Sequence, residues 1–260
     1  AANDAGTITG LGNEAVTITD TSVAADLLKT ADSKTSGVVA VNSTTVTGSY
    51  TDVNDVFDAN TAGTISGLGN EAVTLSGTNT VAQLNTIAGK TTGIVTATIS
   101  DNDMSTLDGI TESGHALTIS VTDSSVAASN LNTLDGKTSV AVGVTSSTIT
   151  GSYTDVLASY AANTAGTISG LGNEAITVSG TATVSQINTI TGDTSGTVTA
   201  TISDNDMSTL DGITESGHAL TISVTDSSVA ASNLNDLNAK TTVAVGVTSS
   251  TVTGSATDVI

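Results

Sequence analysis

Apolar residues recur along the chain in two alternating spacings. In one kind of segment they lie three or four positions apart, as Leu84 and Ile87 do behind the polar residue Thr80. In the other kind they alternate with small or polar residues, mostly Thr and Ser, as in residues 95–99. The first spacing predicts a short amphipathic helix with a Ser, Thr or Asp N-cap. The second predicts a half-buried β-strand.

Each predicted helix carries one apolar anchor. The anchors are Leu28, Val53, Leu84, Leu107, Leu131, Val156, Ile187, Leu210, Leu234 and Val259, and successive anchors lie between 23 and 31 residues apart. Strands are expected at residues 73–75, 95–99, 117–121 and 140–144, and Gly89 is expected to end a helix. We therefore predict a repeat solenoid of β-rich α/β class, whose coils of about 24 residues each contain a β-strand and a short helix.

A string of small β-sandwich domains is the competing architecture, but sandwiches lack recurrent helical anchors. The coil size is that of leucine-rich repeats, although their consensus and its asparagine ladder are absent. The insertion at residues 63–71, rich in Gly and Asn, is expected to form a turn or a protruding loop.

A much longer repeat contains these modules. Residues 60–157 reappear at 163–260 with 16 differences in 98 positions, and residues 95–132 are copied without change. We divide the chain into a short repeat unit at 3–59, a full 103-residue repeat at 60–162 and a second, truncated repeat at 163–260. The short unit is the same design with two modules omitted, as expected where each module contacts only its neighbours. We expect residues 1–260 to be a single solenoid segment of a longer array.

Composition favours a thin core. The chain has 52 Thr, 33 Ser, 26 Gly, no Pro, one Phe and three Tyr, so Val, Ile, Leu, Ala and Thr must fill its interior. Ser-, Thr- and Gly-rich acidic chains are often disordered, but 37% hydrophobic residues and a mean hydropathy of +0.20 oppose that interpretation.

Charge limits the partners. The net charge is −20, from 25 acidic residues and five lysines. Nucleic acids and anionic membranes are bound through clustered cations, so neither is expected as a partner. There is no run of about 18 apolar residues, so no membrane span is expected.

Two acidic clusters are weak metal candidates: Asp101 with Asp103, and Asp204 with Asp206. They resemble the start of a calcium loop, and an acidic chain attracts divalent cations. The EF-hand pattern also needs a Gly at its sixth position, where this chain has Thr106. Helix N-capping by the same carboxylates is the alternative.

No catalytic or cofactor-binding residue is expected, and we predict that the chain is not an enzyme. Gly89-Lys90-Thr91 lacks the earlier Gly of a phosphate-binding loop, and there is no Gly-x-Ser-x-Gly elbow. His115 and His218 occur once per long repeat and are expected to face solvent at the start of a strand.

Three phrases carry a resemblance to a known family. They are the run that starts at Thr80-Val81-Ala82, the run from Ser124 to Thr138 and the run from Thr150 to Val156. They resemble the repeats of giant cell-surface and extracellular proteins of marine cyanobacteria and other aquatic bacteria. The resemblance implies export, an extracellular or cell-surface location, and a structural, adhesive or motility-linked role.

Together these features predict a non-enzymatic structural segment of a secreted fibre, sheath or surface coat, whose partner is itself by end-to-end or lateral assembly. One alternative is a calcium-influenced adhesin stalk or multivalent binding module that binds cell-surface glycans through residues 63–71. Ice binding is a further alternative, based on the Thr-x-Thr strands at residues 96–98 and 199–201.

Overall fold

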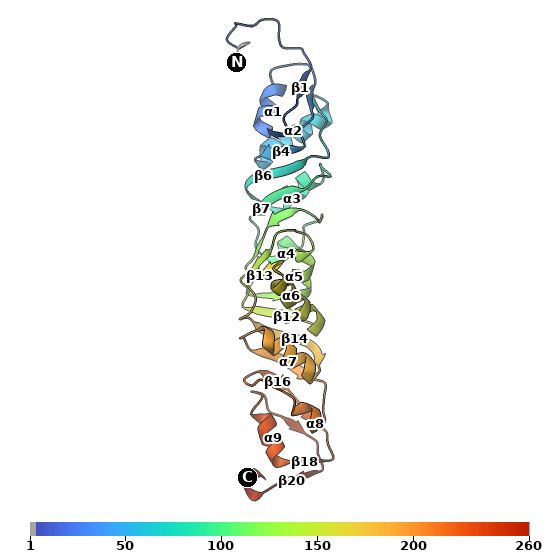
Figure 1. Cartoon of the computed structure of the whole chain (residues 1–260), viewed down its shortest axis with the longest axis vertical. Coiled ribbons are helices and arrows are strands. Elements are labelled where there is room, and N and C mark those ends of the chain that lie inside the picture. Colours follow the sequence, from blue (N-terminus) through green and yellow to red (C-terminus); the bar gives the residue numbers. More distant parts are fainter. Residues whose placement is uncertain (1–3, 260) are drawn as a thin grey trace. The chain divides into compact units, whose positions relative to one another are not determined.

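The computed structural model describes residues 4–259 and is an α/β protein with parallel strands (Figure 1). Over this range it has ten helices and twenty strands, nearly all of them short. The chain forms two compact units. Unit 1 contains the residues up to 120 together with 136–142, and unit 2 contains 121–135 together with 143–260. The predicted α/β class is therefore confirmed.

Unit 1 contains eight strands and four helices. The strands are β1 (Val16–Ile18), β2 (Ser22–Ala24), β3 (Val39–Val41), β4 (Thr45–Gly48), β5 (Ile65–Ser66), β6 (Ala72–Asn79), β7 (Val95–Ile99) and β8 (Ala116–Thr118). The helices are α1 (Ala25–Asp32), α2 (Tyr50–Ala62), α3 (Val81–Ala88) and α4 (Met104–Leu107).

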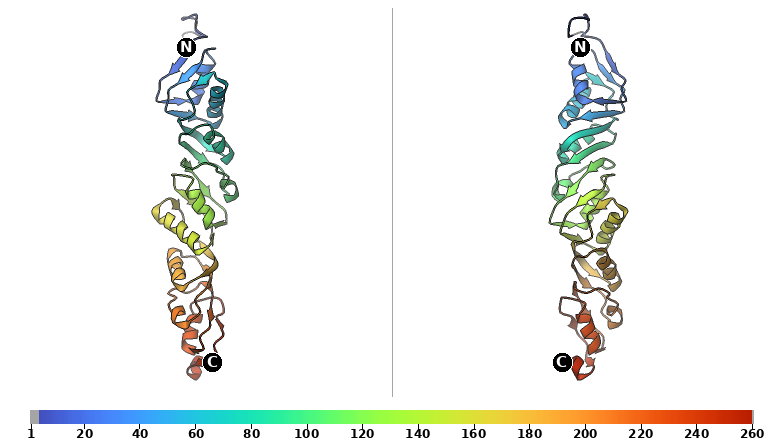
Figure 2. Two further views of the ribbon diagram at one scale, coloured as in Figure 1. Left: turned by 90° about the vertical axis from the view of Figure 1, so that its right-hand side faces the viewer. Right: turned by 60° about the vertical axis from the view of Figure 1, so that its left-hand side comes forward.

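The remaining elements follow the same design. The strands are β9 (Ser120–Val121), β10 (Ser125–Ala127), β11 (Val142–Val144), β12 (Thr148–Gly151), β13 (Ile168–Ser169), β14 (Ala175–Ala182), β15 (Val198–Ile202), β16 (Ala219–Thr221), β17 (Ser223–Val224), β18 (Ser228–Ala230), β19 (Gly246–Val247) and β20 (Thr251–Thr253). The helices are α5 (Ala128–Asp135), α6 (Tyr153–Ala165), α7 (Val184–Asp193), α8 (Met207–Leu210), α9 (Ala231–Asn238) and α10 (Ala256–Val259). Figure 2 shows these elements from two further sides.

Strands of unit 1 pair in parallel with strands further along the chain. The sheet orders are β1-β3-β5 and β2-β4-β6-β7-β8. Paired residues lie between 20 positions apart, as Thr96 and Ala116 do, and 27 positions apart, as Thr45 and Ala72 do. A parallel pair needs a crossover connection, and the short helices α1, α2 and α3 provide it.

Unit 2 repeats this arrangement. Its larger sheets have the orders β10-β12-β14-β15-β16 and β13-β11-β9, and the pairs β17-β19 and β18-β20 form two small sheets. The elements β14, β15, β16, α6 and α8 begin and end 103 residues after β6, β7, β8, α2 and α4. Similar sequences 103 residues apart thus form the same local structure.

The predicted anchors form the core. All ten lie in helices, and eight of them, from Leu28 to Leu210, are completely buried. Leu234 is partly buried, and Val259 is exposed. The sequence pattern therefore identified the interior residues of both units.

Two local predictions were wrong. Val140 is exposed and the strand begins only at Val142. The strand expected at residues 117–121 is interrupted and forms β8 and β9. Gly89 does end α3, but in a right-handed conformation with a φ of −70°. The left-handed C-caps are Gly63 and Gly166, where glycine is favoured because it has no Cβ.

A buried threonine hydroxyl joins the Gly- and Asn-rich segment at residues 63–71, and its copy at 166–174, to the next module. Thr91 Oγ1 donates to the Glu71 carbonyl at 2.7 Å and accepts from the Gly93 N–H at 3.0 Å. Thr194, Glu174 and Gly196 repeat the pair of bonds at 2.8 and 2.9 Å. A Cβ on Gly93 would lie 2.1 Å from the Glu71 carbonyl oxygen, so this crossing requires glycine.

Asparagines on the helices make a second set of contacts between modules. Asn85 and Asn188 donate from Nδ2 to the carbonyls of Gly109 and Gly212, both at 2.7 Å. Two more asparagines act in the same way: Asn132 donates to Asp155 O and Asn235 donates to Asp258 O, each at 3.0 Å. The sequence pattern indicated only that the leucine-rich-repeat asparagine ladder is absent and did not predict these contacts.

Substituting two glycines tests the close crossing. We expect Gly93→Ala to lower the free energy of unfolding by about 1–3 kcal/mol, because backbone atoms cannot move aside for the new Cβ. Gly192, inside α7, has open space around it, so Gly192→Ala should raise stability by about 0.5–1 kcal/mol. Urea unfolding of both variants measures this, and equal effects of the two would contradict the packing described.

Candidate functional site

The predicted metal candidates Asp101 and Asp103 bind the N-termini of two different helices. Asp103 is the N-cap of α4, where its Oδ1 accepts from the Thr106 N–H at 3.1 Å and from the Ser105 hydroxyl at 2.5 Å. Asp101 Oδ2 accepts from the N–H of Val81, the first residue of α3, at 2.7 Å. Hydrogen bonds, first from Ser105, lower the pKa of Asp103.

The second copy repeats this geometry. Asp206 accepts from the Thr209 N–H at 3.1 Å and from the Ser208 hydroxyl at 2.6 Å. Asp204 accepts from the Val184 N–H at 2.7 Å. The N-capping alternative is therefore confirmed at Asp103 and Asp206, and Asp101 and Asp204 cap the helix of the preceding module.

Within residues 4–259, no three His, Asp or Glu side chains come together in a way that could hold a metal ion. One oxygen of each carboxylate is already bonded to a backbone N–H. Calcium binding by Asp101, Asp103, Asp204 and Asp206 stays a prediction.

The histidines do not face solvent as expected. His115 is buried, and its Nδ1 accepts from the Val95 N–H at 3.2 Å. His218, which is partly buried, accepts from the Val198 N–H at 3.1 Å. An accepting Nδ1 places the proton of the neutral ring on Nε2, which in His115 is buried without a partner among the described residues. Burial lowers the pKa of both imidazoles.

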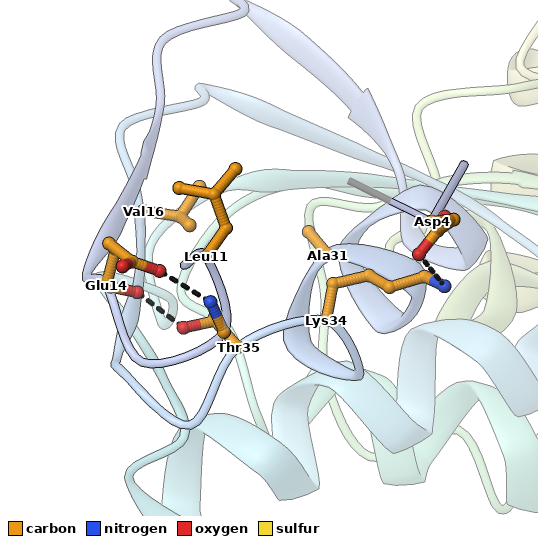
Figure 3. A pocket seen from close by; sticks show the side chains of 8 residues that line it. Asp4, Leu11, Glu14, Val16, Ala31, Lys34 and Thr35 are labelled. Carbon is orange, nitrogen blue, oxygen red and sulfur yellow. Dashed lines mark hydrogen bonds and ion pairs between the residues drawn. The ribbon is translucent and has the colours of Figure 1, made fainter. Parts of the chain in front are cut away.

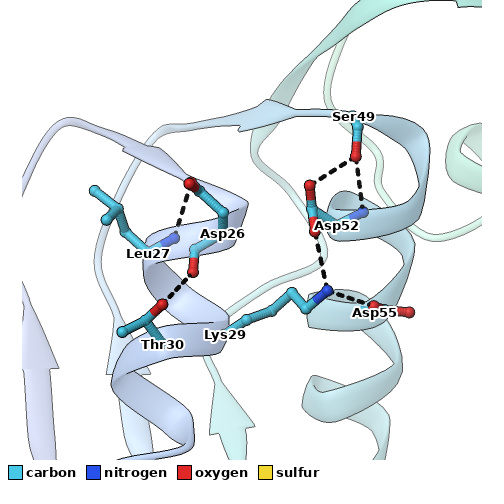
Figure 4. A network of polar contacts seen from close by, with 7 residues as sticks. All are labelled: Asp26, Leu27, Lys29, Thr30, Ser49, Asp52 and Asp55. Carbon is cyan, nitrogen blue, oxygen red and sulfur yellow. Dashed lines mark hydrogen bonds and ion pairs between the residues drawn. The ribbon is translucent and has the colours of Figure 1, made fainter.

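The lysines are held within the chain. Lys29 on α1 binds Asp52 and Asp55 on α2 at 2.9 and 2.7 Å (Figure 4). The hydrogen bonds, first to Asp55, raise the pKa of Lys29, and the bond from Ser49 lowers that of Asp52. Lys90 on the turn after α3 binds Asp58 and Asn54 of α2. These ion pairs connect neighbouring helices of unit 1.

Unit 2 replaces these charged contacts with neutral ones. The positions of Lys29 and Val56 are taken there by Asn132 and Ser159. The Ser159 hydroxyl is completely buried and lies 2.7 Å from Asn132 Oδ1. Because the helix contact survives with different chemistry, the charges of the Lys29 cluster serve helix packing.

Buried glutamates organise the Gly-rich turn. Glu71 and Glu174 are each 2% exposed. The Oε2 of Glu71 accepts from the backbone N–H groups of Gly69 and Asn70 at 2.7 and 3.2 Å. In unit 2 the Tyr160 hydroxyl donates to Glu174 at 3.0 Å, and burial raises the pKa of that phenol.

Residues 63–71 thus form a turn, which was one of the two expectations, and not a protruding loop, because Ile65 and Glu71 are buried. The role of the glutamate was not predicted from the sequence. The phrase Gly-Leu-Gly-Asn-Glu, repeated at residues 10–14, 67–71 and 170–174, was the signal that could have revealed it.

A pocket of about 290 Å³ lies beside the first of these glutamates, Glu14 (Figure 3). Its surface is mainly apolar, and Lys34 and Asp4 form an ion pair at 2.9 Å at one side. The lining residues are Asp4, Leu11, Gly12, Glu14, Val16, Ala31, Lys34 and Thr35. The corresponding glutamate of unit 2, Glu174, is contacted by Tyr160.

The Thr-x-Thr strands expose their threonines. Thr96 and Thr98 of β7 and Thr199 and Thr201 of β15 are exposed, whereas Ala97 between the first pair is buried. Thr74 lies opposite Thr96 in the parallel register. Ice binding by this face stays a prediction.

The histidines predict a pH dependence. The imidazole pKa is lowered in the folded state, so below about pH 6.5 the unfolded chain binds protons that the folded chain does not. The contribution of the two histidines to the free energy of unfolding should therefore be fully present above that pH and decrease as the pH drops toward 5. In the double variant His115→Asn and His218→Asn, an amide oxygen can replace Nδ1 as acceptor without titrating. Urea unfolding at pH 7.5 and 5.0 should show a smaller loss in this variant, and an equal loss would contradict the assignment.

Within residues 4–259, none of the helices has the length and apolar character that crossing a membrane requires. No family model, curated protein or solved structure matches the chain.

Proposed function

We propose that the chain is a non-enzymatic structural segment of a secreted bacterial fibre, sheath or surface coat, built as a continuous α/β solenoid. The observation that carries the proposal is the parallel pairing of strands 20 to 27 residues apart throughout both units. Stacked modules that contact only their neighbours produce length and surface, which are what such a material needs.

Contacts between modules support this proposal. Hydroxyl groups repeatedly donate to a carbonyl 23 residues earlier, as Thr44 does to Thr21 and Ser147 does to Ser124. Asn85 and Asn188 reach carbonyls 24 residues later. Each module thus completes the hydrogen bonding of the next, which favours an extended array.

The charge distribution is consistent with an exposed, solvated material. Lys29, Lys34 and Lys90 bind acids of the same chain, and Lys137 and Lys240 bind backbone carbonyls. The acids in excess leave a net charge of −20, which keeps extended surfaces soluble. The proposed extracellular location is based on the resemblance to bacterial surface proteins. The proposed binding partner is another copy of the same chain.

A calcium-influenced adhesin stalk that binds glycans is the alternative. Like the structural segment, such a stalk requires a stiff array of modules. Unlike the structural segment, it also requires a surface that binds a ligand. Residues 63–71, the first choice for that surface, contain the buried Ile65 and Glu71. The packing of this segment favours the structural role.

Deleting one whole repeat tests the modular array. Removal of residues 60–162 joins Ala59 to Asn163, and residues 163–175 are identical to residues 60–72, which follow Ala59 in the native chain. Asp193→Lys is added so that a lysine again faces Asp58, as Lys90 does. We expect a folded protein with an unchanged circular dichroism signal per residue and a cooperative urea transition, because every remaining module keeps a neighbour of its own type.

The control removes residues 60–150, which is a shorter but out-of-register deletion. It joins α2 to α6, so two helices instead of one separate β4 from the next long strand, β14. We expect loss of stability and cooperativity in the control alone. Unfolding of the in-register variant, or equal behaviour of the two, would contradict a modular array.

A further inference from the structure

Residues 8–18 reproduce a segment that elsewhere covers a sheet edge. They match residues 65–75 at nine of eleven positions, the exceptions being Thr9 for Ser66 and Ile18 for Leu75. Residues 65–75 contain β5, which pairs with β3, and the start of β6, which pairs with β4. In unit 2 the equivalent strands β13 and β14 pair with β11 and β12. This sequence thus covers the same kind of edge twice.

Residues 8–18 already have the backbone conformation of the paired segment. Gly10 and Gly12 have φ of +88° and +142°, close to +91° and +139° at Gly67 and Gly69. Glu14 Oε2 accepts from the Gly12 and Asn13 N–H groups at 2.6 and 3.1 Å. Glu71 makes the same two bonds. A preformed segment loses little conformational entropy on binding.

The surface of residues 8–18 is nevertheless uncovered. Ile8 and Leu11 are exposed, whereas Ile65, the equivalent of Ile8, is completely buried. A Cβ on Gly10 would meet nothing within 4 Å, but on Gly67 it would lie 2.4 Å from the Val41 carbonyl oxygen and on Gly170 2.2 Å from that of Val144. Gly10 therefore leaves the same space that a neighbouring carbonyl oxygen fills at Gly67 and Gly170.

A matching edge is uncovered in unit 2. Among the described residues, β19 pairs only with β17 and β20 only with β18. Val247 of β19 is 42% exposed, whereas its equivalents Val41 and Val144 are 3% exposed. Val252 of β20 is 46% exposed, whereas Val46 and Ile149 are completely buried. Unpaired parallel strand edges of this kind are templates for another strand.

We propose that β19 and β20 of one copy of this chain bind residues 8–18 of a second copy. The added segment would pair as β5 and β6 pair with β3 and β4, and Gly10 would approach the Val247 carbonyl. The interface is heterologous, so each bound copy still offers a free edge and assembly continues. This inference rests on the proposed structural role and specifies which surfaces meet.

Sedimentation of the 260-residue chain over concentrations up to about 1 mM tests the proposal. We expect the average mass to rise with concentration beyond that of a dimer. Gly10→Ala should abolish assembly because the new Cβ would meet the Val247 carbonyl. Val252→Asp should abolish it because pairing would bury the carboxylate. Each variant should keep the urea unfolding midpoint of its matched control.

The controls keep the local chemistry and leave the interface intact. Gly6 also has a positive φ in open space, and its equivalents Gly63 and Gly166 stay open, so Gly6→Ala should assemble normally. Leu27 is exposed on α1, and the equivalent positions are Asn130 and Asn233, so Leu27→Asp should assemble as well. A mixture of the Gly10→Ala and Val252→Asp variants should stop at a one-to-one complex, because one intact interface remains between them.

A chain that stays monomeric up to about 1 mM, a mass that stops at the dimer, or normal assembly of Gly10→Ala would overturn the proposal. The structural role is tested separately by the in-register deletion. A monomeric wild type with a folded deletion variant would refute only the docking. An assembling wild type with an unfolded deletion variant would refute only the modular array.

Discussion

The structure depends on completing the backbone hydrogen bonds of short parallel strands. Many of these strands have only two or three residues, so strand pairing alone leaves many donors and acceptors at their ends. Buried polar groups without partners are costly. Hydroxyls such as those of Thr91 and Thr194, and amides such as that of Asn85, supply the missing bonds from a neighbouring module. This need gives a reason for the 52 Thr and 33 Ser.

The same requirement explains how the chain folds without a large aromatic core. Eight of the ten modules bury one completely enclosed aliphatic anchor, such as Leu84 or Leu131, between a short helix and a strand. The modules approach closely because glycine stands where the turn crosses the preceding carbonyl, as at Gly93 and Gly196. Contacts between neighbouring helices can differ in chemistry between the two units. Lys29 and Asp55 of unit 1 correspond to Asn132 and Ala158 of unit 2.

Sequence periodicity predicted what depends on local spacing. The helical anchors, the strand β7 and the capping role of Asp103 follow from apolar spacing and from the polar residue before each helix. Features that depend on contacts between distant residues were not predictable in this way. The burial of His115 and Glu71 and the asparagine contacts arise only when segments 20 or more residues apart stack. The exact repetition of Gly-Leu-Gly-Asn-Glu indicated a structural constraint on this segment. It did not indicate that Glu71 and Glu174 would be buried.

The most direct test of in-register parallel stacking uses pairs of cysteines in a chain that has none. Thr47 and Thr74 are register partners on β4 and β6, and partners on adjacent strands lie about 5 Å apart at Cα, within the range for a disulfide. Thr45 pairs with Ala72, so Thr45 and Thr74 are offset by two residues and lie beyond that range. Mild oxidation should close a disulfide in the variant Thr47→Cys, Thr74→Cys and not in Thr45→Cys, Thr74→Cys. Equal or reversed yields would contradict the register from which the whole account follows.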